Sequence, residues 1–589
     1  MTGQHGYPRP QLQRPRWESL NGRWDFAIDP DGAIEVPDAV VWNASITVPF
    51  APETSASGIG DTGFYRRCWY RRRFAAPARA PGERLLLHVG AVDHAATVWL
   101  NGRLAARHEG GYTPFSADVT PLLHGDGPQT LVVRADDDPH DLAKPRGKQD
   151  WQAEPHAIWY PRTTGIWQTV WLEVVPPWSI ADLHWTATVE HWAIDLAATM
   201  DGPPRGDLRL RVRLQTADRL LADDTYLATE GEIQRTIGLV DPGIDNARRA
   251  LLWSPEQPTL IQAELHLLDA DQRVLDTVTS YTAMRTVSAD GDRFLLNGRP
   301  YFLRLLLDQG YWPHSGLSAP DDATLRHDVD LAKALGFNGV RKHQKIEDPR
   351  FLYWADTLGL LVWEELPSAY RFTPTAVRRS TSEWIAAILR DRSHPCIVAW
   401  VPFNESWGVP DLPTSQAQRD YVQALYHLTR TLDASRPVIG NDGWEFVTAD
   451  LVGIHDYDAD VERLARRYTA ADGAAGLLAR ERPGRRRLAL DGHPYAGQPI
   501  VLSECGGLAL GGPQHADGSW GYTWAATPDA FAQRYQALMA TLHALPLLAG
   551  FAYTQFTDTY QEVNGLVTAD RTPKAPIETI AQATRGPRR

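Results

Sequence analysis

The stretch LRHDVDLAKALGFNGVR, residues 325–341, decides the fold of the second half of the chain. Its apolar side chains at positions 325, 329, 332 and 335 recur at helical spacing, and Gly336 ends the helix. A β-rich run, Phe337 to Arg341, follows at once. A helix that leads directly into a strand is typical of βα units around a parallel sheet.

The same alternation continues on both sides of this stretch. Asp348 and Pro349 begin another helix, which Gly359 ends just before a further β-rich run. In total we expect eight barrel strands, at Tyr301–Leu307, Phe337–Arg341, Leu360–Glu364, Ile397–Phe403, Val438–Asn441, Leu451–His455, Ile500–Ser503 and Gly550–Phe556. Eight such units between residues 289 and 589 predict a (β/α)8 TIM barrel.

The first half of the chain has short β-rich runs with frequent turn signals instead. Between residues 1 and 178 these runs predict an antiparallel β sandwich, with strands at Leu85–Val89, Ala96–Leu100, Thr130–Arg134 and Thr169–Val174. Between residues 179 and 288, apolar and polar residues alternate around Leu210 and Leu265, which indicates half-buried strands. That length suits one immunoglobulin-like β sandwich. We therefore expect three domains, at 1–178, 179–288 and 289–589.

The composition excludes several classes of protein. The chain has 589 residues, with 59 Lys and Arg against 72 Asp and Glu, and a formal net charge of −13. Charges of both signs are interspersed, which argues against nucleic acid or a membrane as a partner. No stretch approaches the roughly 18 apolar residues of a membrane span, and Met1 to Pro15 lack the core of a signal peptide. Three scattered cysteines fit a reduced, cytoplasmic location.

Two glutamates follow barrel strands on the face where such barrels carry their active sites. Glu405 follows strand four in WVPFNESW, residues 400–407, and Glu504 follows strand seven in IVLSECGG, residues 500–507. They are 99 residues apart, which corresponds to three βα units of 33. Two carboxylates that face each other across a sugar ring are what glycoside hydrolysis requires. The sequence therefore predicts a glycosidase.

A longer motif surrounds Glu405: DRSHPCIVAW, residues 391–400, leads into Asn404 and Glu405. Further motifs are LNGRWDF (20–26), WLNG (99–102), TGIW (164–167) and LNGRP (296–300). Together they resemble glycoside hydrolase family 2, which includes β-galactosidases, β-glucuronidases and β-mannosidases. Ser393 and Val401 depart from the family pattern, which has Asn at the first position and Gly or Ser at the second. The resemblance implies a jelly-roll sugar-binding-like domain, an immunoglobulin-like domain and a catalytic TIM barrel.

The resemblance also implies roles for individual residues. Glu405 would be the general acid/base and Glu504 the nucleophile of a retaining mechanism, with the carboxyl groups about 5 to 5.5 Å apart. Asn404 would hydrogen-bond the sugar 2-hydroxyl, and Tyr457 would hydrogen-bond the nucleophile and keep it ionised. Glu405 has to be protonated when it meets the substrate. We expect no cofactor.

Departures from the family pattern narrow the substrate. Glucuronidases of the family bind the sugar carboxylate with Asn-x-Lys, where this chain has EVNG at residues 562–565. The acidic residue and the missing lysine argue against a glucuronidase. Ala369 and Arg371 stand where large β-galactosidases carry magnesium ligands, so we expect no catalytic metal. From the family's Arg-x-Ser-His, Arg341 is kept, and His343 is the candidate for the histidine.

Other side chains at strand ends are candidates for sugar contact. The polar ones are Asp308, Gln309, Glu365, Asn441, Asp442, His455, Tyr553, Gln555 and Asp558. Of the 22 tryptophans, those that follow barrel strands and suit stacking on sugar are Trp407, Trp312 and Trp444. Trp363 and Trp400 lie within strands, and we expect them to pack in the core. The family resemblance also implies that the region Trp151 to Arg162 of the first domain sends a polar loop toward the barrel, with Asp150, His156 and Arg162 as candidates.

We therefore expect a retaining exo-β-glycosidase that removes a terminal neutral sugar, a β-D-galactoside first of all, from an oligosaccharide or glycoside. A β-galactofuranosidase, a β-mannosidase and an arabinosidase of the same family are alternatives. The alternative of another class is a non-catalytic carbohydrate-binding protein on a glycosidase scaffold, although it would not need both glutamates. A β-glucuronidase with a different carboxylate clamp is a further alternative. The expected partner is a small carbohydrate, and two β domains offer surfaces for a homodimer or larger homo-oligomer.

Overall fold

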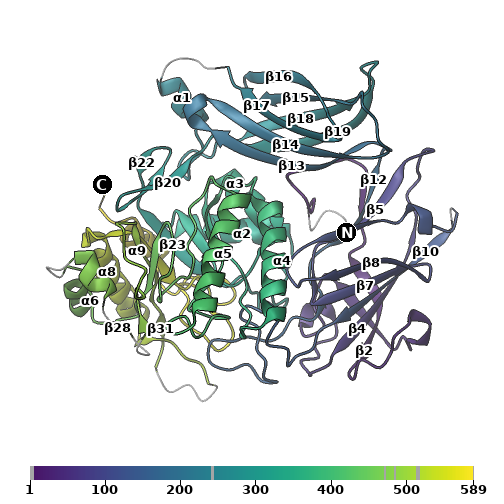
Figure 1. The fold of residues 1–589 in the computed structure, drawn as a ribbon. Helices are drawn as coiled ribbons and strands as arrows, with labels where there is room; N and C mark the ends of the chain where they lie inside the picture. Colours follow the sequence, from purple (N-terminus) through teal and green to yellow (C-terminus); the bar gives the residue numbers. More distant parts are fainter. Residues whose placement is uncertain are drawn as a thin grey trace.

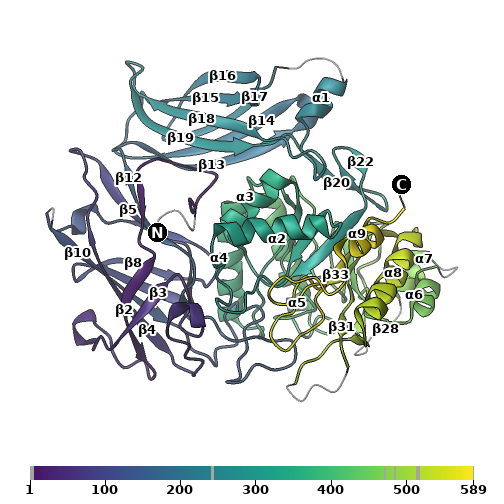
Figure 2. The same ribbon diagram turned by 180° about the vertical axis from the view of Figure 1, so that it is seen from behind.

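The computed structural model describes residues 6–125, 127–240, 245–469, 473–479, 481–482, 486–512 and 518–587. It has three parts, a purple to blue β sandwich, a blue-teal β sandwich and a green to yellow barrel (Figure 1). Figure 2 shows the same parts from behind, with both sandwiches beside the barrel. The expected multidomain architecture is thus present. The predicted domain limits fall between β12 (Val170–Val175) and β13 (Ser179–Thr188) and inside β20 (Val287–Asp290), and they remain predictions.

The first sandwich consists of two antiparallel sheets and a short ladder. The four-stranded sheet has the order β1 (Trp17–Ser19), β12, β5 (Arg84–Val89) and β9 (Phe115–Asp118). The six-stranded sheet has the order β3 (Ala44–Val48), β2 (Gly22–Asp29), β4 (Arg67–Ala75), β10 (Pro128–Asp136), β7 (Ala95–Leu100) and β8 (Arg103–Glu109). The ladder joins β11 (Gly165–Ile166) to β6 (Val92–Asp93). Alternate residues of each strand enter the shared core, as Leu131, Val133 and Ala135 of β10 do.

A long segment between β10 and β11, residues 137–164, reaches across to the barrel, and we call it the interdomain loop. The backbone N–H groups of Arg146 and Gly147 donate to the carbonyl oxygen of Ser368, at 3.1 and 3.2 Å. Gly147 has a φ of +58°, and a Cβ there would collide with the carbonyl oxygen of Gln344. Glycine therefore permits the close approach that fixes the loop against the barrel.

The second sandwich also packs two antiparallel sheets on a common core. Its sheets have the orders β13, β14 (Ala193–Asp201), β17 (Glu232–Gly238) and β16 (Leu220–Leu227), β15 (Arg209–Gln215), β18 (Ile261–Leu268), β19 (Val274–Thr282). Leu210, Val212 and Leu214 of β15 pair with Leu267, Leu265 and Ala263 of β18, all of them buried. The predicted alternation therefore places one face of each strand in the core. Helix α1 (Asp245–Leu251) follows β17.

The barrel begins after a small sheet of β20, β21 (Arg293–Leu296) and β22 (Arg299–Pro300). Its parallel strands have the order β26 (Ile397–Val401), β25 (Leu361–Glu365), β24 (Gly339–Lys342), β23 (Leu303–Asp308), β33 (Leu548–Thr554), β30 (Ile500–Gly506) and β27 (Val452–His455). The helices of this part are α2 (Asp322–Ala334), α3 (Pro349–Leu358), α4 (Pro374–Asp391), α5 (Gln416–Leu432), α6 (Val461–Tyr468), α7 (Gly473–Leu478), α8 (Pro528–Ala544) and α9 (Ile577–Arg585). Two short ladders pair β28 (Glu481–Arg482) with β29 (Arg486–Arg487) and β31 (Leu508–Leu510) with β32 (Thr523–Ala525).

The predicted helix start at Asp348 and Pro349 has a side-chain cap. Asp348 accepts a hydrogen bond from the backbone N–H of Arg350 at the start of α3, and Pro349 occupies the first turn. Gly359 ends this helix in the left-handed conformation, with a φ of +80°. The strand β25 begins two residues later. The alternation of helix and strand is therefore marked by local residues, which explains why the sequence predicts it. None of the helices in the described ranges is long and apolar enough to cross a membrane.

Strand five, predicted at Val438–Asn441, does not form a regular strand, and this prediction was wrong. Val438 makes an isolated parallel bridge to Trp400, and Asp442 makes another to Asn404. The backbone between these bridges bonds to residues 448–449 rather than to β27. This segment therefore joins β26 and the turn after it through single bridges, and hydrogen bonds of Gly443 with Gly453 and His455 join it to β27, without a continuous ladder.

Buried hydrogen bonds join the second sandwich to the barrel. Asp356 of α3 accepts them from the Tyr281 hydroxyl of β19 at 2.8 Å, from His394 Nδ1 at 2.6 Å and from the backbone N–H of Cys396 at 2.8 Å. All four residues are buried. Part of the motif at residues 391–400 thus holds two domains together.

Candidate active site

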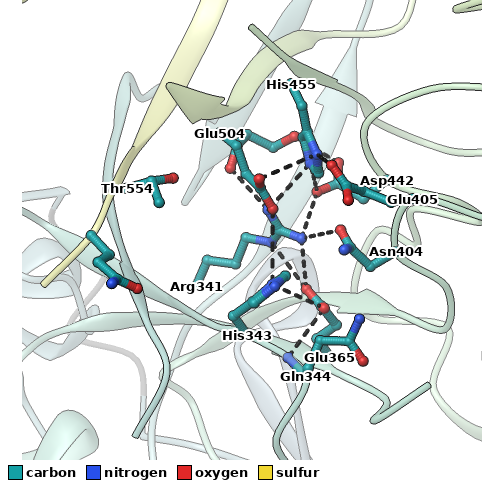
Figure 3. Close-up of polar contacts among 12 residues, drawn as sticks. Arg341, His343, Gln344, Glu365, Asn404, Glu405, Asp442, His455, Glu504 and Thr554 are labelled. Atoms are coloured by element: carbon teal, nitrogen blue, oxygen red, sulfur yellow. Dashed lines mark hydrogen bonds and ion pairs between the residues drawn. The ribbon is translucent and has the colours of Figure 1, made fainter. Parts of the chain in front are cut away.

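A pocket opens at the carboxyl ends of the barrel strands. The described residues that line it are Lys148, Ile158, Leu307, Gln309, His343, Asn404, Glu405, Trp407, Tyr457, Glu504, Tyr522, Thr554 and Glu562. Both predicted glutamates are among them. Figure 3 shows Glu405 and Glu504 with His455 between them and Arg341 below.

A strained turn carries Glu405 into the pocket directly after β26. Glu405 and Ser406 both have left-handed backbones, with φ of +50° and +59°. Such values are uncommon outside glycine and persist only where neighbours hold them. Here the backbone N–H of Glu405 donates to the carbonyl oxygen of Asp442 at 2.9 Å, and that of Ser406 donates to Asn441 Oδ1 at 3.0 Å. The bridges in place of strand five therefore hold the turn of Glu405.

Glu504 comes from the opposite side of the barrel, near the end of β30. A carboxylate oxygen of Glu405, a ring nitrogen of His455 and a carboxylate oxygen of Glu504 all lie within 4.8 Å of one another. Glu405 keeps 17% of its side chain exposed, against 7% for Glu504. The two carboxylates thus face one pocket, with Glu405 nearer to solvent.

The guanidinium of Arg341, fully buried at the end of β24, connects four polar side chains (Figure 3). It donates to Oε1 of Glu504 at 2.8 Å, to Oδ1 of Asn404 at 2.5 Å and to Oε2 of Glu365 at 2.8 Å. Oδ2 of Asp442 lies 3.0 Å from the same group. Burial alone would raise the pKa of Asp442, but the charge of Arg341 holds it below its ordinary value. Arg341 therefore offsets the negative charge of these buried carboxylates and fixes their orientation.

His455 lies between the two glutamates and carries a positive charge. Its Nδ1 is 2.7 Å from Oε1 of Glu405 and 3.3 Å from Oε2 of Glu504, while Nε2 is 3.1 Å from Oδ2 of Asp442. Burial by itself lowers the pKa of His455, but Glu504, Asp442 and Glu405 outweigh it and raise the pKa to about 10. Both ring nitrogens therefore donate at neutral pH.

Tyr457 holds the second oxygen of Glu504. Its hydroxyl donates to Oε2 of Glu504 at 2.6 Å and lies 3.0 Å from Oγ1 of Thr554. Burial and the charge of Glu504 raise the pKa of Tyr457 well above its usual value, so the hydroxyl stays protonated and donates. The ring stacks on Tyr522, with centroids 3.6 Å apart and an interplanar angle of 3°.

Asn404 and His343 complete the wall beside Arg341. The carbonyl oxygen of Asn404 accepts from Arg341, which leaves its amide nitrogen to donate toward the pocket. Nδ1 of His343 is 3.2 Å from Oε1 of Glu365. Burial and the neighbouring charge of Arg341 hold the pKa of His343 well below its usual value, so its ring is neutral.

The interdomain loop contributes a lysine to the deep end of the pocket. Lys148 is buried and lines the pocket, and its ammonium lies 5.7 Å from the ring centroid of Tyr160. The Tyr160 hydroxyl donates to Oε2 of Glu562 at 2.6 Å, and Asn564 donates to Oε1 at 3.1 Å. Burial raises the pKa of Glu562, and the charge of Lys148 opposes this effect. A cation and a carboxylate therefore both line the buried end of the pocket.

The triad of Glu405, His455 and Glu504 has the spacing of a metal site. The protonated ring of His455 has no lone pair to offer a metal ion, and the guanidinium of Arg341 lies 2.8 Å from Glu504. These positive charges disfavour the binding of a metal cation. They favour chemistry by proton transfer between side chains of the protein.

Two family models match the chain in the domains that build this pocket. Residues 287–504 match "Glycosyl hydrolases family 2, TIM barrel domain", and residues 61–167 match "Glycosyl hydrolase 2 galactose-binding domain-like". The chain belongs to glycoside hydrolase family 2. The first match contains the turn of Glu405 and ends at Glu504, and the second contains the loop segment with Lys148.

Relatives within family 2 differ in the sugar that their names state. A β-galactosidase of Thermoanaerobacter pseudethanolicus is 29% identical over 432 residues, 72% of this chain and 54% of that enzyme. The chain thus matches about half the length of this relative. A β-glucuronidase of Paenibacillus borealis is 25% identical over 468 residues, 73% of this chain and 74% of that enzyme.

Solved structures of family 2 enzymes share the fold over nearly the whole chain. A β-glucuronidase of Bifidobacterium dentium, in complex with coumarin-3-O-glucuronide, has a TM-score of 0.77 at 21% identity, and 98% of each chain is covered. A β-galacturonidase of Eisenbergiella tayi, bound to glycerol, has a TM-score of 0.73 at 21% identity, again with 98% of each chain covered. These matches confirm the fold of two sandwiches and a barrel.

The structure brings most of the predicted family 2 residues together. Asn404, Glu405, Trp407, Tyr457, Glu504, His343 and Gln309 line the pocket. Arg341 and His455 lie directly behind this lining, in contact with Glu504, Asn404 or Glu405. Glu365 and Asp442 lie behind them, and both bind Arg341. The positions at strand ends, together with the family resemblance, thus predicted most of the side chains that meet here.

Four predicted sugar contacts lie away from the pocket lining, because protein groups use their polar atoms. Asp308 is bound by Lys342 at 2.6 Å, and Asn441 bonds the turn at Ser406. The other two are Gln555, which accepts a hydrogen bond from Gln309 at 2.9 Å, and Tyr553, whose hydroxyl accepts one from the backbone of Leu508 at 3.3 Å. The same holds for Asp558, bound by Lys574.

The predicted residues of the interdomain loop also bind other groups of the protein and do not line the pocket. Asp150 accepts hydrogen bonds from the backbone and ring of His156, and Arg162 donates to Asp137 at 2.8 Å. The loop contributes Lys148 and Ile158 to the pocket instead. Thr554 and Tyr522 line the pocket as well, and the sequence did not predict them. Of these four residues, only Lys148 could have been identified from the sequence, because it is a charged residue beside the loop that was expected to reach the barrel.

Proposed function

We propose that the protein is a retaining exo-β-glycosidase that uses Glu405 as acid/base and Glu504 as nucleophile. The observation that carries this proposal is the pair of carboxylates on one pocket, with oxygens within 4.8 Å of each other. Retaining enzymes have carboxyl groups about 5–5.5 Å apart, whereas inverting enzymes leave about 6.5–9.5 Å for a water molecule. The separation supports direct attack by the second carboxylate.

In the first step, Glu504 attacks the anomeric carbon while Glu405 gives its proton to the glycosidic oxygen, and the leaving group departs. In the second step, Glu405 takes a proton from water, which attacks the same carbon and releases Glu504. Arg341 and Tyr457 bind the two oxygens of Glu504 at 2.8 and 2.6 Å, so they stabilise its charge and aim it. The greater exposure of Glu405 supports its role, because that residue has to meet the leaving group and then water.

The closed deep end of the pocket supports removal of a single terminal sugar. Lys148, Tyr160 and Glu562 join the interdomain loop to the loop after β33, and all three are buried. A longer chain of sugars could not extend past this wall. We therefore infer an exo mode of action.

For the sugar, we propose a neutral hexose and first of all a β-D-galactoside. Glu562 supports this choice, because its carboxylate suits hydroxyl donors and repels a sugar carboxylate. A panel of p-nitrophenyl β-glycosides, pyranosides and furanosides, tests activity and sugar together. Glu504→Gln is the matched variant, and it should lose turnover at least ~10⁴-fold while it still folds, which its circular dichroism spectrum checks. Retained activity in this variant, or no cleavage of any glycoside, would contradict the mechanism.

A second candidate is a β-uronidase, favoured by one observation in the pocket. Lys148 places an ammonium at the deep end, where it could bind a sugar carboxylate in place of the lysine missing at residues 562–565. Relatives named β-glucuronidase support this alternative. The β-glucuronide and β-galacturonide of p-nitrophenol should then be cleaved faster than the galactoside.

A further inference from the structure

The lining of the pocket divides into a buried polar part and an exposed apolar part. The buried residues are Lys148, Leu307, Gln309, His343, Asn404, Glu504, Thr554 and Glu562, all polar except Leu307. The partly or fully exposed residues are Ile158, Glu405, Trp407, Tyr457 and Tyr522. Apart from Glu405, this outer group consists of aromatic and aliphatic side chains.

Trp407 forms one wall of the outer part, two residues after Glu405. Its ring meets Trp159 of the interdomain loop and Tyr370 edge to face, with centroids 5.6 and 5.2 Å away. The indole N–H of Trp159 donates to the Tyr370 hydroxyl at 2.7 Å, which locks these two rings together. Trp407 is therefore held rigidly beside Glu405 although it remains partly exposed.

Tyr522 forms another wall and is unusually open for its size, with 45% of its surface exposed. One ring face is covered by Tyr457, which holds Glu504. Gly507 lies close behind the ring, and a Cβ at this position would collide with it. The exposed ring thus has one fixed position at the mouth of the pocket, and Ile158 of the interdomain loop adds an aliphatic contact there.

The position of Glu405 tells which part of the substrate meets these walls. A general acid has to reach the glycosidic oxygen, so the leaving group lies on its solvent side. A sugar leaving group would need hydrogen-bond partners for several hydroxyls. Among the described residues of the outer part, the hydroxyl of Tyr457 already binds Glu504, which leaves the hydroxyl of Tyr522 and the indole N–H of Trp407 besides the acid itself. Aromatic side chains can also stack on a sugar ring, but a planar aromatic ring fits these flat apolar walls without needing partners for hydroxyl groups.

We propose that Trp407, Tyr522 and Ile158 form a leaving-group site for a planar aromatic aglycone, so that the substrates are aryl β-glycosides. This inference rests on the proposed glycosidase function. It adds the class of molecule that is released, which the two glutamates alone do not determine.

The test compares leaving groups on the sugar that the panel identifies. Wild type, Tyr522→Leu and Trp407→Leu are assayed with the 2-naphthyl glycoside, the phenyl glycoside, a disaccharide and the glycosyl fluoride, which carries no aglycone. The ratio of kcat/KM for the naphthyl glycoside to that for the fluoride should fall about tenfold in both variants. An effect on Glu504 changes both substrates and cancels in this ratio. An effect on the acid Glu405 lowers cleavage of the phenyl glycoside as well, so the ratio of the naphthyl to the phenyl glycoside separates it from loss of the aromatic site. Tyr226→Leu, in the second sandwich, is the matched control and should keep the wild-type ratio.

Two results would overturn the inference: an unchanged ratio in both variants, or a wild-type preference for the disaccharide over the naphthyl glycoside. Calorimetric titration with free 2-naphthol separates the site from the reaction. Binding to wild type that weakens about fivefold or more in Tyr522→Leu supports the aromatic site even without turnover. Absence of cleavage of every substrate would then count against the proposed function alone.

Discussion

Nδ1 of His455 lies 2.7 Å from Oε1 of Glu405, and the same nitrogen lies 3.3 Å from Glu504. The imidazolium thus bridges the two carboxylates that the proposed mechanism uses. Asp442 binds the other ring nitrogen at 3.1 Å and fixes the direction of the ring. A charged histidine in this place keeps two acidic groups close together, which their repulsion would otherwise oppose.

His455→Gln should remove a pH-dependent part of the stability. The pKa of His455 is about 10 in the folded protein against an ordinary 6.5, so the folded state binds the proton more tightly. The stabilisation is complete below pH 6.5, on the order of 3–5 kcal/mol, and is lost as the pH rises toward 10. The difference in thermal midpoint between wild type and variant should therefore shrink from pH 6 to pH 10. Exposed His327→Gln is the control, and a constant difference for His455→Gln would contradict the prediction.

Tyr457→Phe should lower kcat about 10²- to 10³-fold with little change in stability. The variant loses the hydroxyl that binds Oε2 of Glu504 at 2.6 Å, so the nucleophile is less well aimed. Steady-state kinetics on the best aryl glycoside measure the effect. Tyr226→Phe loses a comparable tyrosine–carboxylate bond, to Asp224 at 3.1 Å, and should keep full activity. Equal kinetics of the two variants would rule out a role of Tyr457 in the reaction.

Arg341→Lys should fail to replace the arginine despite the equal charge. A lysine ammonium cannot reach Glu365, Asn404 and Glu504 at once, as the planar guanidinium does. At least one buried carboxylate is left unpaired, which costs about 3–5 kcal/mol. We expect a lower thermal midpoint together with a loss of kcat. A variant with wild-type stability and only a raised KM would show that Arg341 merely contacts the sugar.

Lys148→Met should lower kcat/KM for the neutral glycoside by about tenfold, because a charged hydrogen-bond donor to a sugar hydroxyl is lost. The interdomain loop should stay in place, since its backbone bonds to Ser368 do not involve this side chain. Kinetics on the galactoside and the glucuronide are measured in parallel. A loss restricted to the glucuronide would instead favour the β-uronidase.

Asp356→Ala should loosen the contact between the second sandwich and the barrel. The Tyr281 hydroxyl, His394 and the backbone N–H of Cys396 lose their common acceptor in the buried interior. Unsatisfied buried donors and the cavity should destabilise the protein by about 3–5 kcal/mol. Thermal unfolding followed by tryptophan fluorescence measures this loss. Exposed Asp529→Ala is the control, and an equally small effect of both would refute the role of Asp356.

The sequence by itself determined the order of the domains and the main carboxylates. The signals for the barrel units are local: helical spacing from Leu325 to Leu335, the stop at Gly336 and the strand after it. They can therefore be recognised in the sequence before the fold is known. Because parallel strands end on one face, Glu405 and Glu504 could be placed on the same pocket from their positions after strands four and seven.

Only the tertiary structure decided which other side chains reach the substrate. Lys148 and Ile158 enter the pocket because the interdomain loop crosses to the barrel, and the periodicity of the sequence carries no record of that contact. Asp308 binds Lys342 and not the substrate, because a buried carboxylate needs a partner and the ammonium of Lys342 provides it. The irregular backbone at residues 438–442 depends likewise on distant bonds, which hold the turn of Glu405. Local spacing thus specified the scaffold and the acids, whereas long-range packing specified the walls around them.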